Sequence, residues 1–152
     1  AGIGEPVFGK LDSELARAIF SIGAVKGFEI GDGFEAARAT GLSNNDAFYY
    51  DETGSLCKKT NHAGGILGGI SDGDDIIYRA AFKPTPSISA KQDTVTKNGE
   101  NISVCVKGRH DPVIVPRAVV VVEAMSTLTL ADAVLENMAA QADIVAHFYQ
   151  HL

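Results

Sequence analysis

The most apolar stretch of the chain is VIVPRAVVVVEAMSTLTLADAVLENMA, residues 113–139. Its opening Val119–Val122 is β-branched and favours a strand by propensity alone. We nevertheless predict one long helix after Pro116, because proline suits the first helical turn and the apolar pattern far exceeds an ordinary strand in length. Apolar residues occur almost all round this helix, which predicts a core helix covered on several sides. Glu123 is then a carboxylate in apolar surroundings that requires a partner.

The residues just ahead of this helix, Gly108-Arg109-His110-Asp111-Pro112, place a cation, an imidazole and a carboxylate side by side. Charged side chains held at the end of a rigid apolar element are more often a functional site than a solvated surface. The same string is also an ordinary turn, in which Pro112 fixes φ and Asp111 bonds to nearby backbone. The residues alone leave both interpretations open.

Upstream, the sequence predicts an amphipathic helix at about residues 12–22. Asp12 is a suitable N-cap, and Gly23 occupies the usual position after the last turn. The apolar positions recur at helical spacing and form one stripe. They are Leu11, Leu15, Ala18, Ile19 and Ile22.

Three segments show the alternation of apolar and polar residues that is typical of strands: residues 25–34, 75–83 and 102–107. In the first, Gly31 and Gly33 indicate a bulge or a close approach of two backbones. The last of these strands leads directly to Gly108, so the polar residues 108–112 follow a strand and precede the long helix.

Residues 41–75 are rich in Gly, Asn, Asp and Ser, a composition that suits an active-site loop more than a packed element. Within them, the paired glycines of Asn61–Ile70 would let a backbone contact a ligand closely, although a flexible apolar hairpin explains them equally well. We interpret His62 as a cap of this loop rather than as a ligand. Residues 91–100 are polar, and we expect them to be mobile.

The segment Lys83-Pro84-Thr85-Pro86-Ser87 ends the second strand, because two prolines forbid further pairing. One cation and two hydroxyls in five residues are suited to a phosphate or to the polar edge of a ring. A plain rigid turn is the alternative interpretation.

The 152 residues, 45% of them hydrophobic, fit a single soluble domain over residues 1–152 with a core that needs neither disulfides nor metal. The net charge of −6 and the pI of about 5.1 argue against nucleic acid or an anionic membrane as the main partner. Cys57 and Cys105 lie far apart without metal-ligand spacing, so we expect no metal and a cytoplasmic location.

We also expect no membrane helix. Val113–Val122 is strongly apolar, but Pro116, Arg117 and Glu123 interrupt it, and no uncharged span of about 20 residues exists. No signal peptide opens the chain. It begins at Ala1 without methionine, which is consistent with processing or with a piece of a longer protein.

Five separated motifs, in this order and spacing, resemble the chorismate synthase family. The resemblance spans nearly the whole chain, and the motifs together are far more specific than any one of them. They are Gly4-Glu5-Pro6-Val7-Phe8; Ala24-Val25-Lys26-Gly27 with Glu29-Ile30-Gly31-Asp32-Gly33-Phe34; Asn61 to Ser71; Lys83-Pro84-Thr85; and Gly108-Arg109-His110-Asp111-Pro112 leading to Arg117-Ala118 and Glu123-Ala124.

The resemblance implies a lyase that eliminates phosphate from 5-enolpyruvylshikimate 3-phosphate in a 1,4-anti sense, with reduced FMN as a cofactor that is not consumed. NADPH is a candidate reductant of that flavin, and the role is in the shikimate pathway of aromatic biosynthesis. The implied fold is α+β: half of a β-α-β sandwich in which an antiparallel sheet packs on the long apolar helix. The family assembles as a homotetramer, and this chain resembles its C-terminal portion, without the N-terminal half.

The resemblance also assigns site residues. Asp111 and Arg109 are the implied catalytic residues, Asp111 as the carboxylate that helps to move a proton near flavin N5. Beside Arg109, Asp111 is expected to stay ionised until it accepts a proton. The implied FMN-binding residues are Gly23, Ala24, Gly68, Lys83, Pro84, Thr85, Pro86, Ser87 and Arg109.

Two of these positions depart from the family pattern, since Gly23 stands where Asn is common and Pro86 where Ser is common. The family's catalytic histidines belong to the first half, so His62 and His110 do not inherit their roles. The alternative function is a non-catalytic flavin-binding or oligomerisation module, which the sequence upstream of Ala1 would distinguish. We expect the chain alone to be inactive, and residues 54–73 and 84–100 to be poorly ordered without flavin.

Overall fold

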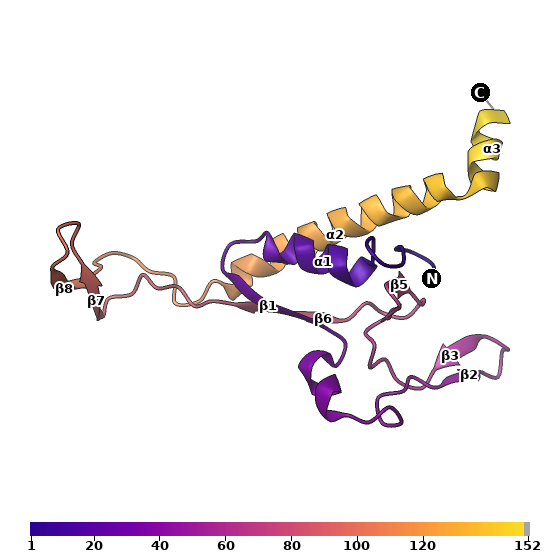
Figure 1. The fold of residues 1–152 in the computed structure, drawn as a ribbon, viewed down its shortest axis with the longest axis horizontal. Helices are drawn as coiled ribbons and strands as arrows, with labels where there is room; N and C mark the ends of the chain where they lie inside the picture. Colours follow the sequence, from indigo (N-terminus) through magenta and orange to yellow (C-terminus); the bar gives the residue numbers. More distant parts are fainter. Residues whose placement is uncertain (151–152) are drawn as a thin grey trace.

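The structure is a computed structural model that describes residues 1–150 as helices attached to four small sheets (Figure 1). Each sheet has two antiparallel strands, and the pairs are β1 with β6, β2 with β3, β4 with β5, and β7 with β8. The elements in chain order are α1 (Leu11–Phe20), β1 (Val25–Ile30), the 3-10 helix η1 (Gly33–Arg38), β2 (Phe48–Tyr50), β3 (Leu56–Lys58), β4 (Ile66–Leu67), β5 (Ile70–Ser71), β6 (Tyr78–Phe82), β7 (Lys91–Val95), β8 (Asn101–Cys105), α2 (Val115–Ala140) and α3 (Ala142–Gln150). The predicted α+β class is confirmed.

The core lies where α1 packs against α2 and β1. Leu11, Leu15 and Ile19 recur at every fourth position of α1 and are almost completely buried. Leu11 and Leu15 form one cluster with Ile66 of β4, and the apolar residues packed against it include Leu130 of α2. The predicted apolar stripe of α1 is therefore confirmed.

The predicted ends of α1 need correction. The N-cap is Lys10, which makes no side-chain capping bond, while Asp12 lies inside the helix and accepts a hydrogen bond from the Ser13 amide. At the other end the C-cap is Ser21. The left-handed backbone after it belongs to Ala24, with φ of 71°, and not to Gly23.

The strand predicted at residues 75–83 is confirmed as β6, which pairs with β1. Glu29 lies opposite Arg79, and the two side chains form an ion pair in which Arg79 Nε lies 2.7 Å from Glu29 Oε1. β1 is shorter than predicted, because it ends at Ile30 and the chain then turns through Gly31. The irregularity in the ladder lies between Val25 and Gly27, not at the glycines that follow.

Residues 91–100, which we expected to be mobile, form β7 and the turn to β8, and their mobility stays a prediction. Thr94 lies opposite Ile102 in this ladder. The turn is closed by a hydrogen bond from the Thr96 amide to the Glu100 carbonyl, with Gly99 at φ of 84°. Backbone pairing thus forms a hairpin from a polar sequence, and the hairpin extends away from α1 and α2 (Figure 1).

The long helix is confirmed as α2, but the prediction that it is covered on several sides is wrong for the chain described here. Ala118 is its only buried residue among those described, whereas Val120 and Leu128 are 66% and 65% exposed. Glu123 is exposed at the border of an apolar hollow between α2 and β6, rather than enclosed. By length and composition α2 could also cross a membrane, with mean hydropathy of 1.8 in its most apolar window.

Candidate functional site

Two of the predicted site segments lie side by side. The chain leaves β6 through Lys83–Ser87, makes the β7–β8 hairpin and returns to α2 through residues 108–112 (Figure 1). Ser87 Oγ and His110 Nδ1 lie 3.0 Å apart and link the outgoing and returning segments. The sequence separation of 23 residues is therefore closed by one direct hydrogen bond.

Ala24 adjoins the same place because its carbonyl accepts a hydrogen bond of 2.7 Å from the Lys83 amide. A non-glycine residue in the left-handed region is uncommon, and such strained residues concentrate at functional sites. Gly23, beside it, has open space where a Cβ would stand. The structure thus brings Gly23 and Ala24 to the Lys83 end of the loop.

Asp111 is paired with a residue of α2. Its Oδ2 lies 2.8 Å from Nη1 of Arg117, in the first turns of that helix. Both side chains of this pair are well exposed, and such ion pairs contribute little stability. Arg109 is itself exposed, and its sequence neighbour His110 contacts the loop through Ser87.

Thr85 is the feature of this loop that points to a ligand. Its hydroxyl oxygen Oγ1 is shielded from solvent and has no hydrogen-bond partner. A shielded polar atom without a partner is unfavourable, and a bound ligand that hydrogen-bonds to it would remove that cost. Its neighbours in the loop are held by hydrogen bonds. Gln92 Nε2 donates a hydrogen bond of 2.8 Å to the Pro86 carbonyl, and the Lys83 amide donates to the Ala24 carbonyl.

Gly68 lies apart from the other predicted cofactor residues. It forms the β4–β5 turn with Gly69, both with positive φ as a two-residue hairpin turn requires. The Gly69 carbonyl accepts from the Leu11 amide at the start of α1, whereas Ala24 follows the end of α1. A helix of 10 residues is about 15 Å long, so Gly68 and Ala24 lie at opposite ends of α1.

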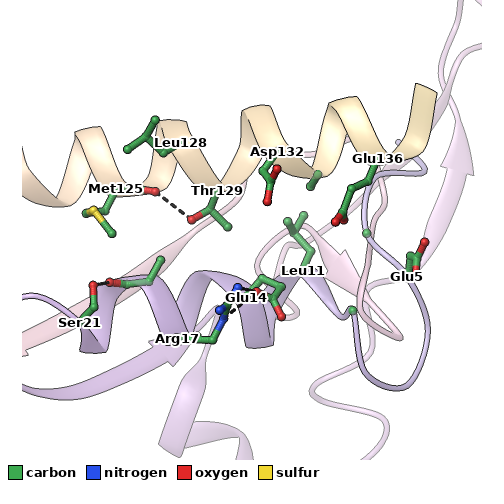
Figure 2. A pocket seen from close by; sticks show the side chains of 14 residues that line it. Glu5, Leu11, Glu14, Arg17, Ser21, Met125, Leu128, Thr129, Asp132 and Glu136 are labelled. Atoms are coloured by element: carbon green, nitrogen blue, oxygen red, sulfur yellow. Dashed lines mark hydrogen bonds and ion pairs between the residues drawn. The ribbon is translucent and has the colours of Figure 1, made fainter. Parts of the chain in front are cut away.

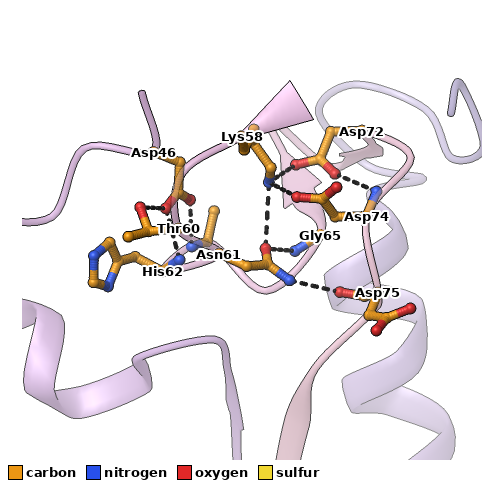
Figure 3. Close-up of polar contacts among 10 residues, drawn as sticks. Asp46, Lys58, Thr60, Asn61, His62, Gly65, Asp72, Asp74 and Asp75 are labelled. Atoms are coloured by element: carbon orange, nitrogen blue, oxygen red, sulfur yellow. Dashed lines mark hydrogen bonds and ion pairs between the residues drawn. The ribbon is translucent and has the colours of Figure 1, made fainter. Parts of the chain in front are cut away.

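Residues 41–75 contain a buried polar cluster that the sequence did not predict (Figure 3). Asp46, 8% exposed, accepts hydrogen bonds from the Thr60 hydroxyl at 2.7 Å and from the amides of His62 and Ala63 at 2.8 and 2.9 Å. Burial alone would raise the pKa of Asp46, but these three donated bonds outweigh it and hold the pKa below its ordinary value. Asp46 therefore fixes the start of the glycine-rich motif.

Lys58 closes the other side of this cluster (Figure 3). Its side chain is 3% exposed, and its Nζ lies 2.6 Å from Asp72 and 3.1 Å from Asp74. Burial would lower the pKa of Lys58, but the hydrogen bonds to both carboxylates raise it. The pKa of Asp72 is lowered, because the Lys58 bond and the Asp74 amide overcome its burial.

Asn61 connects the two sides of the cluster. Its Oδ1 accepts from Lys58 Nζ and from the Gly65 amide, and its Nδ2 donates to the Asp75 carbonyl. The interpretation of His62 as a loop cap is consistent with its bonds, since its amide binds Asp46 and its ring lies 2.7 Å from Asp32. Residues 54–73 therefore have fixed polar contacts in this structure, while their ordering by flavin stays a prediction.

A hollow of about 660 Å³ forms a groove between α1 and α2 and contains none of the predicted site residues (Figure 2). Leu11, Met125 and Leu128 supply apolar surface there. Its carboxylates are those of Glu5, Glu14, Asp132 and Glu136. Because carboxylates repel a phosphorylated substrate, this groove is not the anion site. Among residues 1–150, no group of three or more His, Cys, Asp and Glu side chains is placed to hold a metal ion.

The fold and site define an α+β protein in which a cation- and hydroxyl-bearing loop adjoins a Gly-Arg-His-Asp-Pro segment. A family model described as chorismate synthase matches residues 1–135, and the chain belongs to the chorismate synthase family. A chorismate synthase of Lachnoclostridium phytofermentans is 68% identical over 150 residues, which are 99% of this chain and 41% of that protein. One of Archaeoglobus fulgidus is 62% identical over 136 residues, covering 89% and 38%.

A solved structure described as a crystal structure of chorismate synthase matches this fold with a TM-score of 0.70 and 33% identity. The match covers 99% of this chain and 38% of that one. The chain thus spans about two fifths of the length of these relatives.

Proposed function

We propose that this chain is the C-terminal part of a chorismate synthase that converts 5-enolpyruvylshikimate 3-phosphate to chorismate by 1,4-anti elimination of phosphate. Family membership supports the reaction class, since the relatives it matches are named as this enzyme. The observation that carries the placement of the site is the unpartnered Thr85 hydroxyl, between the Lys83 cation and the Ser87–His110 bond.

The residues of this loop fit reduced FMN as the proposed cofactor. FMN offers a phosphate, ribityl hydroxyls and the polar edge of its ring, and the loop offers a cation, a shielded hydroxyl and a bonded hydroxyl to meet them. When bound, the reduced flavin would supply transient electron density to the allylic system of the substrate. We assign its binding to Gly23, Ala24, Lys83, Thr85, Ser87 and Arg109; Pro84 and Pro86 shape the loop, and Gly68 is the assignment that the geometry supports least.

The chain's own residues then have distinct tasks. Lys83 and Arg109 would stabilise the anionic groups, where charge increases on the leaving phosphate. Asp111, held through Oδ2 by Arg117, is the proposed proton-transfer residue. Arg117 therefore holds the carboxylate that we assign to proton transfer.

We extend the proposal to the setting of the enzyme. Cys57 and Cys105 are both free thiols, which is compatible with the reducing cytoplasm we propose as its location. A homotetramer and an NADPH-dependent supply of reduced flavin belong to the same proposal. Family membership is the support for both.

The decisive experiment replaces Asp111 by Asn in the complete enzyme. Asparagine keeps the size and much of the hydrogen bonding but cannot accept the proton, so turnover should fall by about 10²- to 10⁴-fold. FMN affinity and melting temperature should change little. Arg109→Lys is the matched variant: it retains charge but loses the planar fork, so FMN or substrate affinity should weaken together with rate.

The outcomes separate catalysis from turn formation. If Asp111 merely holds the turn before α2, Asp111→Asn should lower stability by about 1 kcal/mol and leave turnover nearly intact. A stable, FMN-binding Asn variant that works at the wild-type rate would remove Asp111 from the mechanism.

A further inference from the structure

His110 is the residue through which the two segments of the candidate site touch. Its Nδ1 lies 3.0 Å from Ser87 Oγ, and its Nε2 lies 3.1 Å from the carbonyl of Val106, just beyond β8. The ring therefore joins three places in the chain: the loop after β6, the end of the hairpin, and the segment that precedes α2. Both ring nitrogens are used, so the orientation of the imidazole is fixed by its own contacts.

These contacts also define the direction of the hydrogen bonds. A carbonyl oxygen can only accept, so Nε2 carries a proton and donates to Val106. In the neutral ring Nδ1 is then an acceptor, and the Ser87 hydroxyl must donate to it. With its proton committed, Ser87 Oγ offers only lone pairs to a ligand.

We propose that His110 is a positioning residue that holds Ser87 in place and makes its hydroxyl a hydrogen-bond acceptor toward the cofactor; this rests on the function proposed above. A phosphate monoester dianion also carries only acceptor oxygens, so it does not match such a hydroxyl. Ser87 instead receives a ligand N–H or O–H, as on a flavin ring edge or a ribityl chain. The phosphate is left to Lys83 and Arg109, which have only donors.

Two substitutions of His110 separate its two bonds. Asparagine places a polar atom near the position of Nδ1, and glutamine places one near the position of Nε2. His110→Asn should therefore retain the Ser87 contact and lose Val106, while His110→Gln should do the opposite. Ser87→Ala is the matched variant on the other side of the bond.

The experiment measures FMN affinity by fluorescence titration, amide hydrogen exchange of residues 83–88 and 108–112, and melting temperature, all in the complete enzyme. His110→Gln and Ser87→Ala should each weaken FMN binding about tenfold, corresponding to the loss of one hydrogen bond, with faster exchange in both segments. The FMN affinity of His110→Asn should stay within about threefold of the wild-type value. The double variant His110→Gln/Ser87→Ala should bind FMN no more weakly than Ser87→Ala alone, because His110 acts on FMN only through Ser87.

Equal FMN affinity in wild type, His110→Gln and Ser87→Ala would overturn the proposal. It would also be overturned if His110→Asn and His110→Gln lost FMN affinity equally and in proportion to their fall in melting temperature. If wild-type enzyme binds no FMN, the proposed function and the cofactor role of Ser87 both fail. Hydrogen exchange still decides whether His110 holds the loop in that case. Unchanged exchange in His110→Gln would show that it does not.

Discussion

At the scale of single residues, Asp46 shows how a charge stabilises a loop that has little apolar surface. Three donors converge on one carboxylate, so its ionised form is favoured even though it is buried. Lys58 is the cationic counterpart: its buried ammonium group binds the carboxylates of Asp72 and Asp74. The glycine-rich motif between them is therefore held by ionised groups, and its stability must depend on pH.

The sign of that dependence follows from the pKa directions. The pKa values of Asp46 and Asp72 are lowered below the ordinary 3.8, so their contribution is complete above that pH and is lost as pH falls through the lower folded-state values. The pKa of Lys58 is raised above 10.5, so its contribution is present below that pH and is lost as pH rises through the higher value.

We predict that Asp46→Asn lowers the free energy of unfolding by about 1.5–3 kcal/mol at pH 7, because an amide Nδ2 would face the Ala63 amide donor. The variant should also lose part of the acid dependence of stability below about pH 4. Urea unfolding of the complete enzyme between pH 3 and 7 measures both effects, with the surface substitution Asp12→Asn as control. Parallel stability curves for wild type and Asp46→Asn would contradict a folded-state origin of the acid dependence.

At the scale of elements, the junction between β1 and the glycine-rich motif is made by backbones in direct contact. Gly31, at φ of 55°, donates to the Ile77 carbonyl, and the next amide, Asp32, donates to the His62 carbonyl. A Cβ on Gly31 would stand 2.0 Å from His62 O and 2.6 Å from Gly64 N. The close approach predicted for Gly31 is thus confirmed, and it joins β1 to residues 61–64.

We predict that Gly31→Ala is severely destabilising, by more than about 3 kcal/mol, because it adds a clash with backbone to the strain of a left-handed residue. Gly68→Ala is the control, since φ is 61° there and its Cβ would meet open space. It should cost only the conformational term of about 1–2 kcal/mol. Thermal melts of both variants decide the matter, and similar losses at both positions would show that the backbone contact is unimportant.

Elements with strong periodicity could be predicted from the sequence, and those made by long-range contacts could not. The apolar stripe of α1 and the length of α2 follow from the spacing of apolar residues along the sequence, so both can be predicted from it. β7 was missed because its residues Lys91–Val95 are mostly polar, and only pairing with β8 makes them a strand. The three partners of Asp46 lie 14 to 17 residues further along the chain, a separation at which no local sequence pattern exists.

The candidate site shows the same contrast between features that local motifs predict and features that depend on long-range contacts. The segments 83–87 and 108–112 were found through their motifs, but the Ser87–His110 bond and the Asp111–Arg117 pair depend on how the β7–β8 hairpin returns to α2. Ala24 shows a further limit. Glycine is the usual left-handed residue after a helix, so the sequence indicated Gly23, whereas the backbone placed that conformation one residue later.

At the scale of the whole molecule, the exposure of α2 is the feature that most needs explanation. One side of the helix meets α1 through Leu130 and Ala133, and its N-terminal half approaches β6 (Figure 1). Large apolar side chains elsewhere on it remain open to solvent, Val120, Leu128 and Leu135 among them at 66%, 65% and 64%. Contiguous exposed apolar surface of this kind marks an interface. The relatives are more than twice as long as this chain, and we propose that their additional length covers this surface.

We therefore predict that residues 1–152, purified alone, form no chorismate from 5-enolpyruvylshikimate 3-phosphate and reduced FMN, and bind FMN weakly. The uncovered α2 should make the isolated chain associate and bind the dye ANS, whereas the complete enzyme should do neither to a comparable extent. Val120→Glu and Leu128→Glu together should reduce association of the isolated chain, because charges on the exposed face oppose it, and should disrupt the complete enzyme, where the same face is covered. Light scattering, ANS fluorescence and a chorismate assay on both lengths provide the comparison. A monomeric isolated chain that melts cooperatively, binds no ANS and forms chorismate at a near-normal rate would show that α2 needs no further cover and that these residues hold the complete site.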